Sequence, residues 1–433
     1  MITRFPACVF LASSAVAAVI GTNSAALPLT EARISALPQT QQAAWREYLT
    51  RSARQMQTDH EALEAEVTKA GLQAPLKAPS GSAAKSIPLD KPAEWYGSTE
   101  ARHIADIIVS FQTPAGGWSK NLNLADHLRR LGEHFTPDNS SPVPGVADFD
   151  TSSDPKWEYV GTLDNDATTT ELRFLEKVAG AARESVADAA RWRDAMLRGL
   201  EYVLAAQYPN GGWPQIWPLQ GGYHDAVTFN DDAMTHALEL LRDVAEGRDT
   251  FAKVPTALRS RARAAVVKGL EVVLATQIVV KGDRTAWGQQ YDMLNLTPAG
   301  ARNYEPPSLT SGESASLMVY LMAEPQPGKA VIDAVRAAAE WLRQTAVYGK
   351  AFQRGPDGRK LIPADGAGPI WSRFYEIGSD RPIFGDRDKT IHDDVNEISL
   401  ERRNGYSWYN AGPKAAMDRY AGWPAASGTP AKK

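Results

Sequence analysis

Apolar residues recur at helical spacing through most of the chain, and three such stretches share one ending. These stretches are residues 104–112, 199–207 and 269–277. Each ends in glutamine, and the first two continue through proline and paired glycines to Trp118 and Trp213 at the same distance. The third needs four more residues to reach Trp287. Because proline stops a helix and glycine favours tight turns, the spacing predicts an internal repeat of helix and turn.

A second apolar helix is predicted after each of these turns. The three helix starts that can be aligned are residues 162–167, 228–233 and 308–313. Each opens with polar residues of the kind that cap helices and continues into apolar positions at helical spacing. Three helix pairs in the same order favour a mainly α fold, an α/α partial toroid of about three helix pairs with an open cleft. Residues 362–423 predict irregular loops and short strands on its C-terminal side.

The two ends of the chain differ from this repeated part. Residues 1–26 combine Arg4, a short apolar run and small residues, a pattern typical of an export signal peptide. Residues 27–93 predict an N-terminal helical region followed by a linker rich in proline, alanine, serine and lysine. We expect the toroid domain to occupy residues 94–423 and a short tail to follow at residues 424–433.

Composition narrows the classes of function. The 433 residues carry 47 Lys+Arg against 51 Asp+Glu, a net charge of −4, so we expect no nucleic acid among the partners. Beyond the predicted signal no apolar run is long enough to span a membrane, and we expect a monomer that is secreted or periplasmic. The single cysteine, Cys8, lies in the signal, so disulfides, thiol nucleophiles and cysteine-ligated zinc are excluded from the mature protein.

Acidic residues gather at the aligned helix starts. Asp164 and Asp166 precede one helix, and Asp231 and Asp232 precede the next. Capping, worth about 1 kcal/mol for each residue, explains one acid per helix but not two. Since adjacent helix starts of a toroid lie at one rim, four converging carboxylates would repel one another unless a cation lies between them. An all-oxygen site favours a hard cation, calcium before magnesium.

Arginines form the second group of candidates. Arg302 lies just before the third aligned helix, and Arg373, Arg381 and Arg387 lie among aromatic and acidic residues nearer the C-terminus. An arginine in a loop is most often only solvated, but guanidinium groups bind carboxylates through two parallel hydrogen bonds. We therefore expect an acidic polymer in the cleft. His224, in the loop before the second aligned helix, is more often a structural histidine than a ligand at such a position.

Several long motifs resemble those of the family 10 polysaccharide lyases, which are pectate lyases. They occur in the family's order at residues 164–175, 207–215, 223–233, 287–292, 311–314, 381–388 and 401–406, with Arg302 among them. The resemblance covers residues 94–412 and does not extend to residues 27–93. It implies an α/α partial toroid that cleaves polygalacturonate (pectate) by calcium-dependent β-elimination, which yields unsaturated oligogalacturonides.

The resemblance also implies roles for single residues. Arg302 stands in the place of the family's catalytic base. Asp164 and Asp231 match its metal-binding aspartates, with Asp232 as a neighbouring candidate for the Ca²⁺ site. The expected substrate-binding residues are Asn165, His224, Arg373, Arg381 and Arg387, of which Arg381 best matches the family's uronate-binding arginine.

Three other functions stay open from the residues themselves. An α/α-toroid glycoside hydrolase acting on an acidic polysaccharide would use Asp164 and Asp232 as acid and base, and its products would lack the ultraviolet absorption of unsaturated uronides. A terpene cyclase shares glutamine and tryptophan repeats and an Asp-x-Asp motif, but Ala167 stands where it needs another acid. A non-catalytic pectin-binding protein would bind polygalacturonate without turnover.

Overall fold

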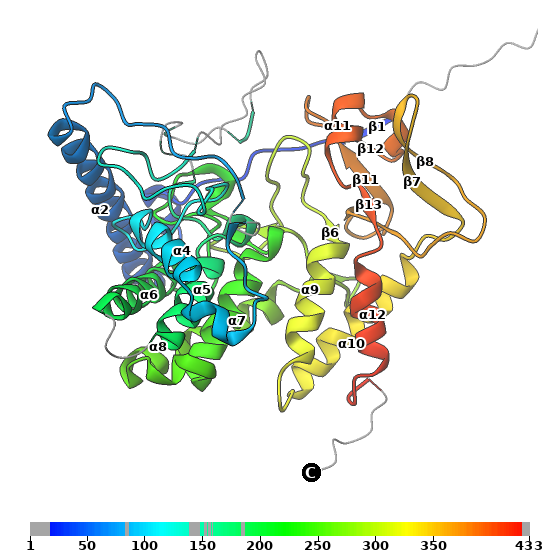
Figure 1. Cartoon of the computed structure of the whole chain (residues 1–433). Helices are drawn as coiled ribbons and strands as arrows, with labels where there is room; N and C mark the ends of the chain where they lie inside the picture. The colour runs from blue at the N-terminus through cyan, green and yellow to red at the C-terminus, as the bar shows by residue number, and fades with distance from the viewer. Residues whose placement is uncertain are drawn as a thin grey trace, which may run out of the picture.

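The computed structural model shows two rows of helices packed against each other, with a small sheet beside them (Figure 1). It describes residues 18–82, 86–137, 148–150, 154, 157, 159–182 and 187–426. The expected mainly α fold, an α/α partial toroid with short strands on its C-terminal side, is confirmed.

The helices of the two rows alternate along the chain. The inner row consists of α5 (Thr169–Ala181), α7 (Ala233–Glu246), α9 (Ser311–Met322) and α12 (Pro413–Ala421). The outer row consists of α4 (Thr99–Ser110), α6 (Ala187–Ala206), α8 (Thr256–Thr276) and α10 (Lys329–Gln344). Helices α7 and α9 are buried on most sides, whereas α8 exposes one face to solvent. The two rows therefore share one hydrophobic core.

A tryptophan closes the turn after each outer helix. Its indole N–H donates a hydrogen bond to a carbonyl in the last turns of that helix. The four bonds run from Trp118 to Ile108 (2.7 Å), from Trp213 to Val203 (2.8 Å), from Trp287 to Val273 (2.7 Å) and from Trp371 to Leu342 (2.7 Å). The fold thus has a fourth repeat, one more than the spacing of the sequence motifs predicts.

The repeated glutamine joins neighbouring outer helices. In the first three repeats its side-chain amide donates both to a carbonyl of its own turn and to a carbonyl of the next outer helix. The acceptors in that next helix are Ala195 for Gln112, Ala265 for Gln207 and Ala334 for Gln277, at 2.8–2.9 Å. In the fourth repeat Ala346 stands four residues after Leu342, where the others have glutamine.

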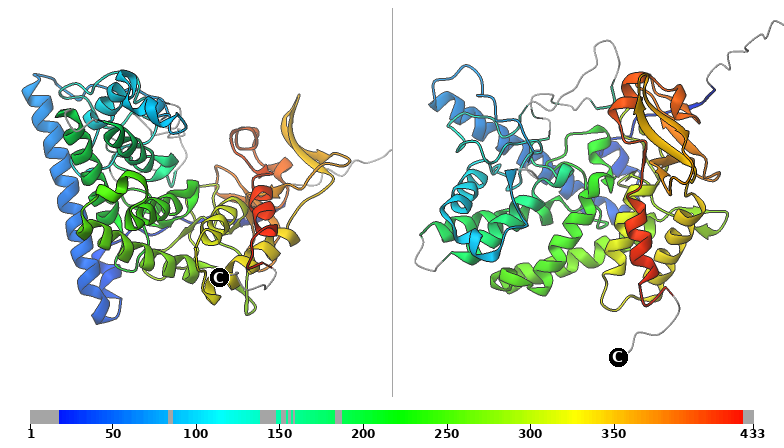
Figure 2. Two further views of the ribbon diagram at one scale, coloured as in Figure 1. Left: turned by 60° about the horizontal axis from the view of Figure 1, so that its bottom comes forward. Right: turned by 45° about the vertical axis from the view of Figure 1, so that its right-hand side comes forward.

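The N-terminal region forms helices that pack against the toroid. Helix α1 (Glu31–Ser35) leads into the long helix α2 (Gln39–Lys69), which runs along one side of the body (Figure 2). The Tyr48 hydroxyl donates a hydrogen bond to the Ala206 carbonyl at 2.8 Å, and Trp45 packs against Tyr208. These contacts tie α2 to the end of α6.

A five-stranded antiparallel sheet lies beside the last repeats. Its strand order is β1-β12-β11-β10-β6. The strands are β1 (Val19–Thr22), β12 (Thr390–His392), β11 (Pro382–Gly385), β10 (Phe374–Tyr375) and β6 (Leu309–Thr310). A separate hairpin of β7 (Lys350–Gly355) and β8 (Gly358–Pro363) follows α10 and separates it from Trp371. The sheet packs over a small aromatic core that includes Tyr304 and Trp408.

Short elements complete the chain. They are η1 (Ala93–Gly97), η2 (Asp164–Asp166), η3 (Gly222–Asp225), β2 (Val227–Thr228), η4 (Asn230–Asp232), η5 (Asp249–Lys253), β3 (Val279–Val280), β4 (Asp283–Arg284), β5 (Gln290–Tyr291), β9 (Trp371–Ser372), η6 (Val395–Glu397), α11 (Leu400–Gly405) and β13 (Tyr409–Asn410). None of the helices in the described ranges has the length and apolar character that crossing a membrane requires.

The two predicted terminal segments fall partly outside the described residues, which leave out 1–17 and 427–433. Residues 19–22, which belong to the predicted signal peptide, form strand β1 and pair with β12. The predicted signal boundary at residue 26 stays a prediction. Because residues 19–22 are part of the sheet, the structure favours a boundary earlier in the chain.

The glutamine bridges predict a measurable contribution to stability. Replacing Gln207 by leucine keeps most of the volume but removes the donor from the Gly211 and Ala265 carbonyls. We expect the free energy of unfolding, measured with urea, to fall by about 1–3 kcal/mol. The control is Gln57→Leu, which removes an exposed bond to Glu61 and should change stability by no more than about 0.5 kcal/mol. Equal effects of both substitutions would contradict a bridging role.

Candidate active site

A polar cavity of about 90 Å³ lies where the turns after the first three repeat tryptophans meet the inner helices. Its lining residues are Lys120, Tyr159, Asp164, Asn165, Gln215, Tyr223, Asn230, Asp231, Gln289, Gln290, Arg302 and Glu305. The cavity therefore brings together four residues that the sequence predicts for the site, namely Asp164, Asn165, Asp231 and Arg302.

The loops before α5 and α7 share an unusual backbone. Asn165 and Asp166 have φ of 51° and 63°, and Asp231 and Asp232 have φ of 49° and 58°. Residues other than glycine rarely adopt this left-handed region, and asparagine and aspartate tolerate it best. Such strain gathers at functional sites, where the surrounding structure holds it in place. Because η2 and η4 also contact each other, the two loops present their side chains to one cavity.

Asp164 lies at the buried end of the cavity and is 3% exposed. One of its carboxylate oxygens accepts a bond from the Lys120 ammonium at 2.6 Å, and that ammonium lies 3.3 Å from the centre of the Tyr159 ring. Burial alone would raise the pKa of Asp164, but Lys120 and Arg302 outweigh it and hold this pKa below its usual range. Asp164 is therefore a carboxylate at neutral pH.

Asp231 lies at the open side of the cavity and accepts a bond from the Asn230 amide at 2.8 Å. Partial loss of hydration and the negative charge of Asp164 raise the pKa of Asp231 to about 6. Asp232 does not line the cavity; it lies with Asp166 near His236, which pairs with Asp166 at 2.8 Å. Geometry thus favours Asp231 over Asp232 as the partner of Asp164.

Three buried oxygens at the cavity have no hydrogen-bond donor among the described residues. They are the second carboxylate oxygen of Asp164 and the amide oxygens of Gln289 and Gln290. Carboxylate and amide oxygens are the ligands that calcium prefers. Within the described ranges no three His, Cys, Asp or Glu side chains converge closely enough to hold a metal ion by themselves. The unpaired oxygens themselves fit a hard cation.

Arg302 enters the cavity in a two-bond ion pair with Glu305, at 2.6 Å and 2.9 Å. The Tyr406 hydroxyl also donates to Glu305, at 2.5 Å. Burial alone would raise the pKa of Glu305, but Arg302 holds it at about 2. In turn, burial would lower the pKa of Arg302, and Glu305 raises it well above the ordinary arginine value. The nearest partner of Arg302 therefore stabilises its protonated form.

The three other arginines lie at different distances from this centre. Arg373 donates to the side-chain amide oxygen of Asn230 at 2.9 Å and pairs with Glu313 at 3.3 Å, so it borders the cavity. Arg387 lies over the Tyr304 ring, 5.1 Å from its centre. Arg381 is instead held in surface ion pairs, with Glu376 at 3.1 Å and Asp393 at 3.2 Å. The expectation that Arg381 binds the uronate stays a prediction, and the geometry favours Arg373.

His224 lies behind the cavity wall. It is 1% exposed, and its Nδ1 is 3.1 Å from the side-chain oxygen of Gln215, which does line the cavity. Burial, followed by the positive charge of Lys120, lowers the pKa of His224 to about 3. A neutral buried imidazole in this place positions Gln215, while direct contact of His224 with substrate stays a prediction.

Lys120, Gln289 and Glu305 line the cavity but are not among the residues that the sequence predicts for the site, although Gln289 falls within the motif at residues 287–292. Lys120 and Gln289 could have been found from their position, because the residue two places after each repeat tryptophan lies at or beside the cavity. These residues are Lys120, Gln215, Gln289 and Arg373. Glu305 lies three residues after Arg302, and nothing in its local pattern distinguishes it from a solvated loop acid.

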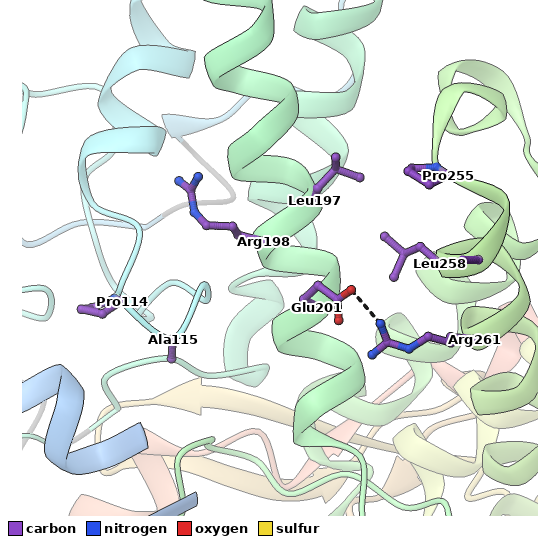
Figure 3. Close-up of a pocket in the computed structure, with 9 residues that line it drawn as sticks. Pro114, Ala115, Leu197, Arg198, Glu201, Pro255, Leu258 and Arg261 are labelled. Atoms are coloured by element: carbon purple, nitrogen blue, oxygen red, sulfur yellow. Dashed lines mark hydrogen bonds and ion pairs between the residues drawn. The ribbon is translucent and has the colours of Figure 1, made fainter. Parts of the chain in front are cut away.

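A larger cleft of about 450 Å³ lies between α6 and α8, away from these loops (Figure 3). It is lined mainly by apolar side chains, and Glu201 pairs across it with Arg261 at 2.7 Å. The cleft holds no group of buried acids or unpaired oxygens among the residues described there. Chemistry rather than size therefore places the candidate site in the smaller cavity.

The raised pKa of Asp231 predicts how a substitution changes stability with pH. The pKa of Asp231 is about 6 in the folded protein and about 4, the ordinary aspartate value, in the unfolded chain. Ionised Asp231 therefore lowers the stability of the fold above about pH 6, whereas below about pH 4 the group is protonated in both states and has no such effect. In chelator at pH 8, Asp231→Asn should therefore unfold at a higher temperature than the wild type, and the difference should shrink as pH falls from 6 to 4. The exposed Asp365→Asn is the control. A lower midpoint for Asp231→Asn at pH 8 would contradict this account.

Comparisons with known proteins identify the family of the chain. The family described as pectic acid lyase matches residues 112–417. The family 10 polysaccharide lyase from Cellvibrio cellulosa is similar in structure, with 29% identity over 80% of this chain and 100% of that chain and a TM-score of 0.64. A mutant of that enzyme in complex with trigalacturonic acid is similar over 78% of this chain and 98% of that chain, with the same identity and TM-score. No curated protein matches. The chain belongs to the pectic acid lyase family.

Proposed function

We propose that this pectate lyase cleaves polygalacturonate by calcium-dependent β-elimination and releases unsaturated oligogalacturonides outside the cytoplasm. One observation carries the proposal: a buried carboxylate oxygen without a donor lies in the same small cavity as an arginine. The first suits a cation and the second suits an anionic sugar. The apolar run at the N-terminus supports export.

Asp164 and Asp231 would hold the calcium ion, with the unpaired amide oxygens of Gln289 and Gln290 near them. When bound, calcium neutralises the uronate carboxylate and so makes the proton at C5 more acidic. A calcium ion held by these oxygens would attract a uronate carboxylate of the substrate to the same place. Metal and substrate then bind together.

The residues of the chain orient the sugar and move its proton. Lys120 and Arg373 supply positive charge around the cavity for uronate carboxylates. In its neutral guanidine form Arg302 accepts the C5 proton at its unprotonated nitrogen; the electrons of the C–H bond form the C4–C5 double bond, and the C4–O bond breaks. The departing oxygen takes a proton from solvent. Since Glu305 stabilises protonated Arg302, its neutral fraction is very small, and the rate should rise with pH.

The hydrolase alternative fits the geometry less well. It needs two carboxylates on opposite sides of one sugar bond, and Asp232 does not line the cavity that contains Asp164. The products decide between the two reactions, since only elimination creates an unsaturated uronide that absorbs ultraviolet light. A protein that only binds pectin would form neither product.

Removing calcium should abolish turnover and leave the fold intact. The core consists of apolar helices packed on one another and contains no metal-dependent element among the residues described. With excess chelator we expect no formation of unsaturated product from polygalacturonate and an unchanged helical circular dichroism spectrum. Added calcium should restore the activity. Full turnover in chelator would remove calcium from the mechanism.

Arg302→Lys tests the assignment of the base. Lysine keeps the charge but loses the planar fork, so proton transfer should suffer more than binding. We expect turnover to fall by at least about 10³-fold, as for the loss of a general base, while affinity for trigalacturonate changes far less.

Arg261→Lys, in the cleft between α6 and α8, is the matched control for the Arg302 substitution and should keep wild-type turnover. If Arg302→Lys instead lost affinity and kept its turnover, Arg302 would clamp the substrate. Lys120 and Arg373 would then be the candidates for the base.

A further inference from the structure

The N-terminal strand lies against the loop that carries Arg302. Strand β1 forms the edge of the sheet, and Val19 pairs with His392 on β12. Just after β1, the backbone N–H of Asn23 donates to the Lys389 carbonyl at 2.8 Å. Figure 1 shows this first segment in blue beside β12, which belongs to the C-terminal part of the chain. The residue that follows the strand, Asn23, is thereby brought next to the loop that carries Arg302.

The side chain of Asn23 is bonded to the backbone of the Arg302 loop. Its amide nitrogen donates to the carbonyl of Arg302 at 2.9 Å and to that of Asn303 at 3.1 Å. Its oxygen accepts from the backbone N–H of Ser24 at 2.9 Å. Asn23 is 7% exposed, so water does not replace these bonds easily. Both amide hydrogens of one buried side chain thus fix two successive carbonyls.

The fit around Asn23 is close. A Cβ atom added to Gly300 would lie 2.6 Å from the side-chain oxygen of Asn23 and 3.1 Å from the Ser24 carbonyl oxygen. The first distance is shorter than real Cβ contacts and the second is tight, so the loop at Gly300 lies close against the N-terminal segment. The loop therefore has little freedom to shift while Asn23 is present.

The same loop holds Arg302 from its other side. The backbone N–H of Arg302 donates to a Glu305 carboxylate oxygen at 3.0 Å, and the Glu305 N–H donates to the Arg302 carbonyl at 2.8 Å. The amide of Asn303 donates to the Arg387 carbonyl at 2.8 Å. Asn23 comes from the N-terminal part of the chain, far in sequence from the other members of this network. Its two bonds orient the peptide groups that follow Arg302 and Asn303.

We propose that Asn23 is a positioning residue for Arg302, and that the working enzyme keeps strand β1 because export processing ends before it. The proposal rests on the proposed function, in which Arg302 accepts the proton. Ala15-Val16-Ala17, directly before the described residues, has the small-x-small pattern of a cleavage site. Cleavage there leaves β1 and Asn23 in the mature chain, whereas cleavage after Ala26 removes both.

The test compares substitutions within this segment, made in the full chain. Asn23→Asp keeps the shape but places a carboxylate against two carbonyls, and Asn23→Ala removes the contacts. Thr22→Ala, at the exposed neighbouring position, is the matched control. Small displacements of a catalytic group cost about 10²-fold in rate, so we expect kcat for polygalacturonate to fall about 10–100-fold in both Asn23 variants. KM should change little, and Thr22→Ala should behave as the wild type.

Two further measurements separate the outcomes. Mass spectrometry of the exported protein should find an N-terminus ahead of Val19, and a chain that begins at Leu27 would overturn the proposal. Wild-type kcat in both Asn23 variants, while Arg302→Lys is inactive, would overturn the positioning role and leave the proposed function standing. Full turnover of Arg302→Lys would instead remove the base assignment itself. The N-terminal mass does not depend on how well any variant folds.

Discussion

The bond from an indole N–H to a carbonyl of the preceding helix is the interaction on which the rest of the structure depends. It recurs in four repeats and fixes the chain direction after each outer helix. The residue two places further on is then held at the same side of the molecule each time. Lys120, Gln215, Gln289 and Arg373 occupy this position. Equivalent positions of the four repeats thereby place polar side chains at or beside one cavity.

Charge balance is the second constraint. Asp164, buried and ionised, is stabilised by Lys120, and Glu305 is stabilised by Arg302. Among the described residues no cation pairs as closely with Asp231, and loss of hydration together with the negative charge of Asp164 raises its pKa. The ionised form of Asp231 is therefore destabilised in the cavity, and a cation bound beside it would stabilise it. The packing of the helices offsets the free-energy cost of the left-handed loops and of the repulsion between Asp164 and Asp231.

Much of the fold could be predicted because its signals are local. A glutamine followed by a tryptophan reveals three repeats, but the fourth has Ala346 at the glutamine position and the β7–β8 hairpin before Trp371. Asp164 and Asp231 could be found as acids at helix starts. The separation of Asp232 from Asp231 could not, because it follows from the left-handed backbone. The contact of Asn23 with the Arg302 loop joins distant parts of the chain, and no spacing encodes it. Glu305 lies only three residues from Arg302, but its local pattern does not distinguish it from a solvated loop acid.

The most direct test of this account is the structure of the Asp231→Asn variant with trigalacturonate bound. The tryptophan-anchored positions should surround the ligand, with uronate carboxylates at Lys120 and Arg373 and with the Arg302 guanidinium facing a C5 hydrogen. A trigalacturonate molecule bound in the cleft between α6 and α8, with the cavity around Asp164 unchanged, would contradict it.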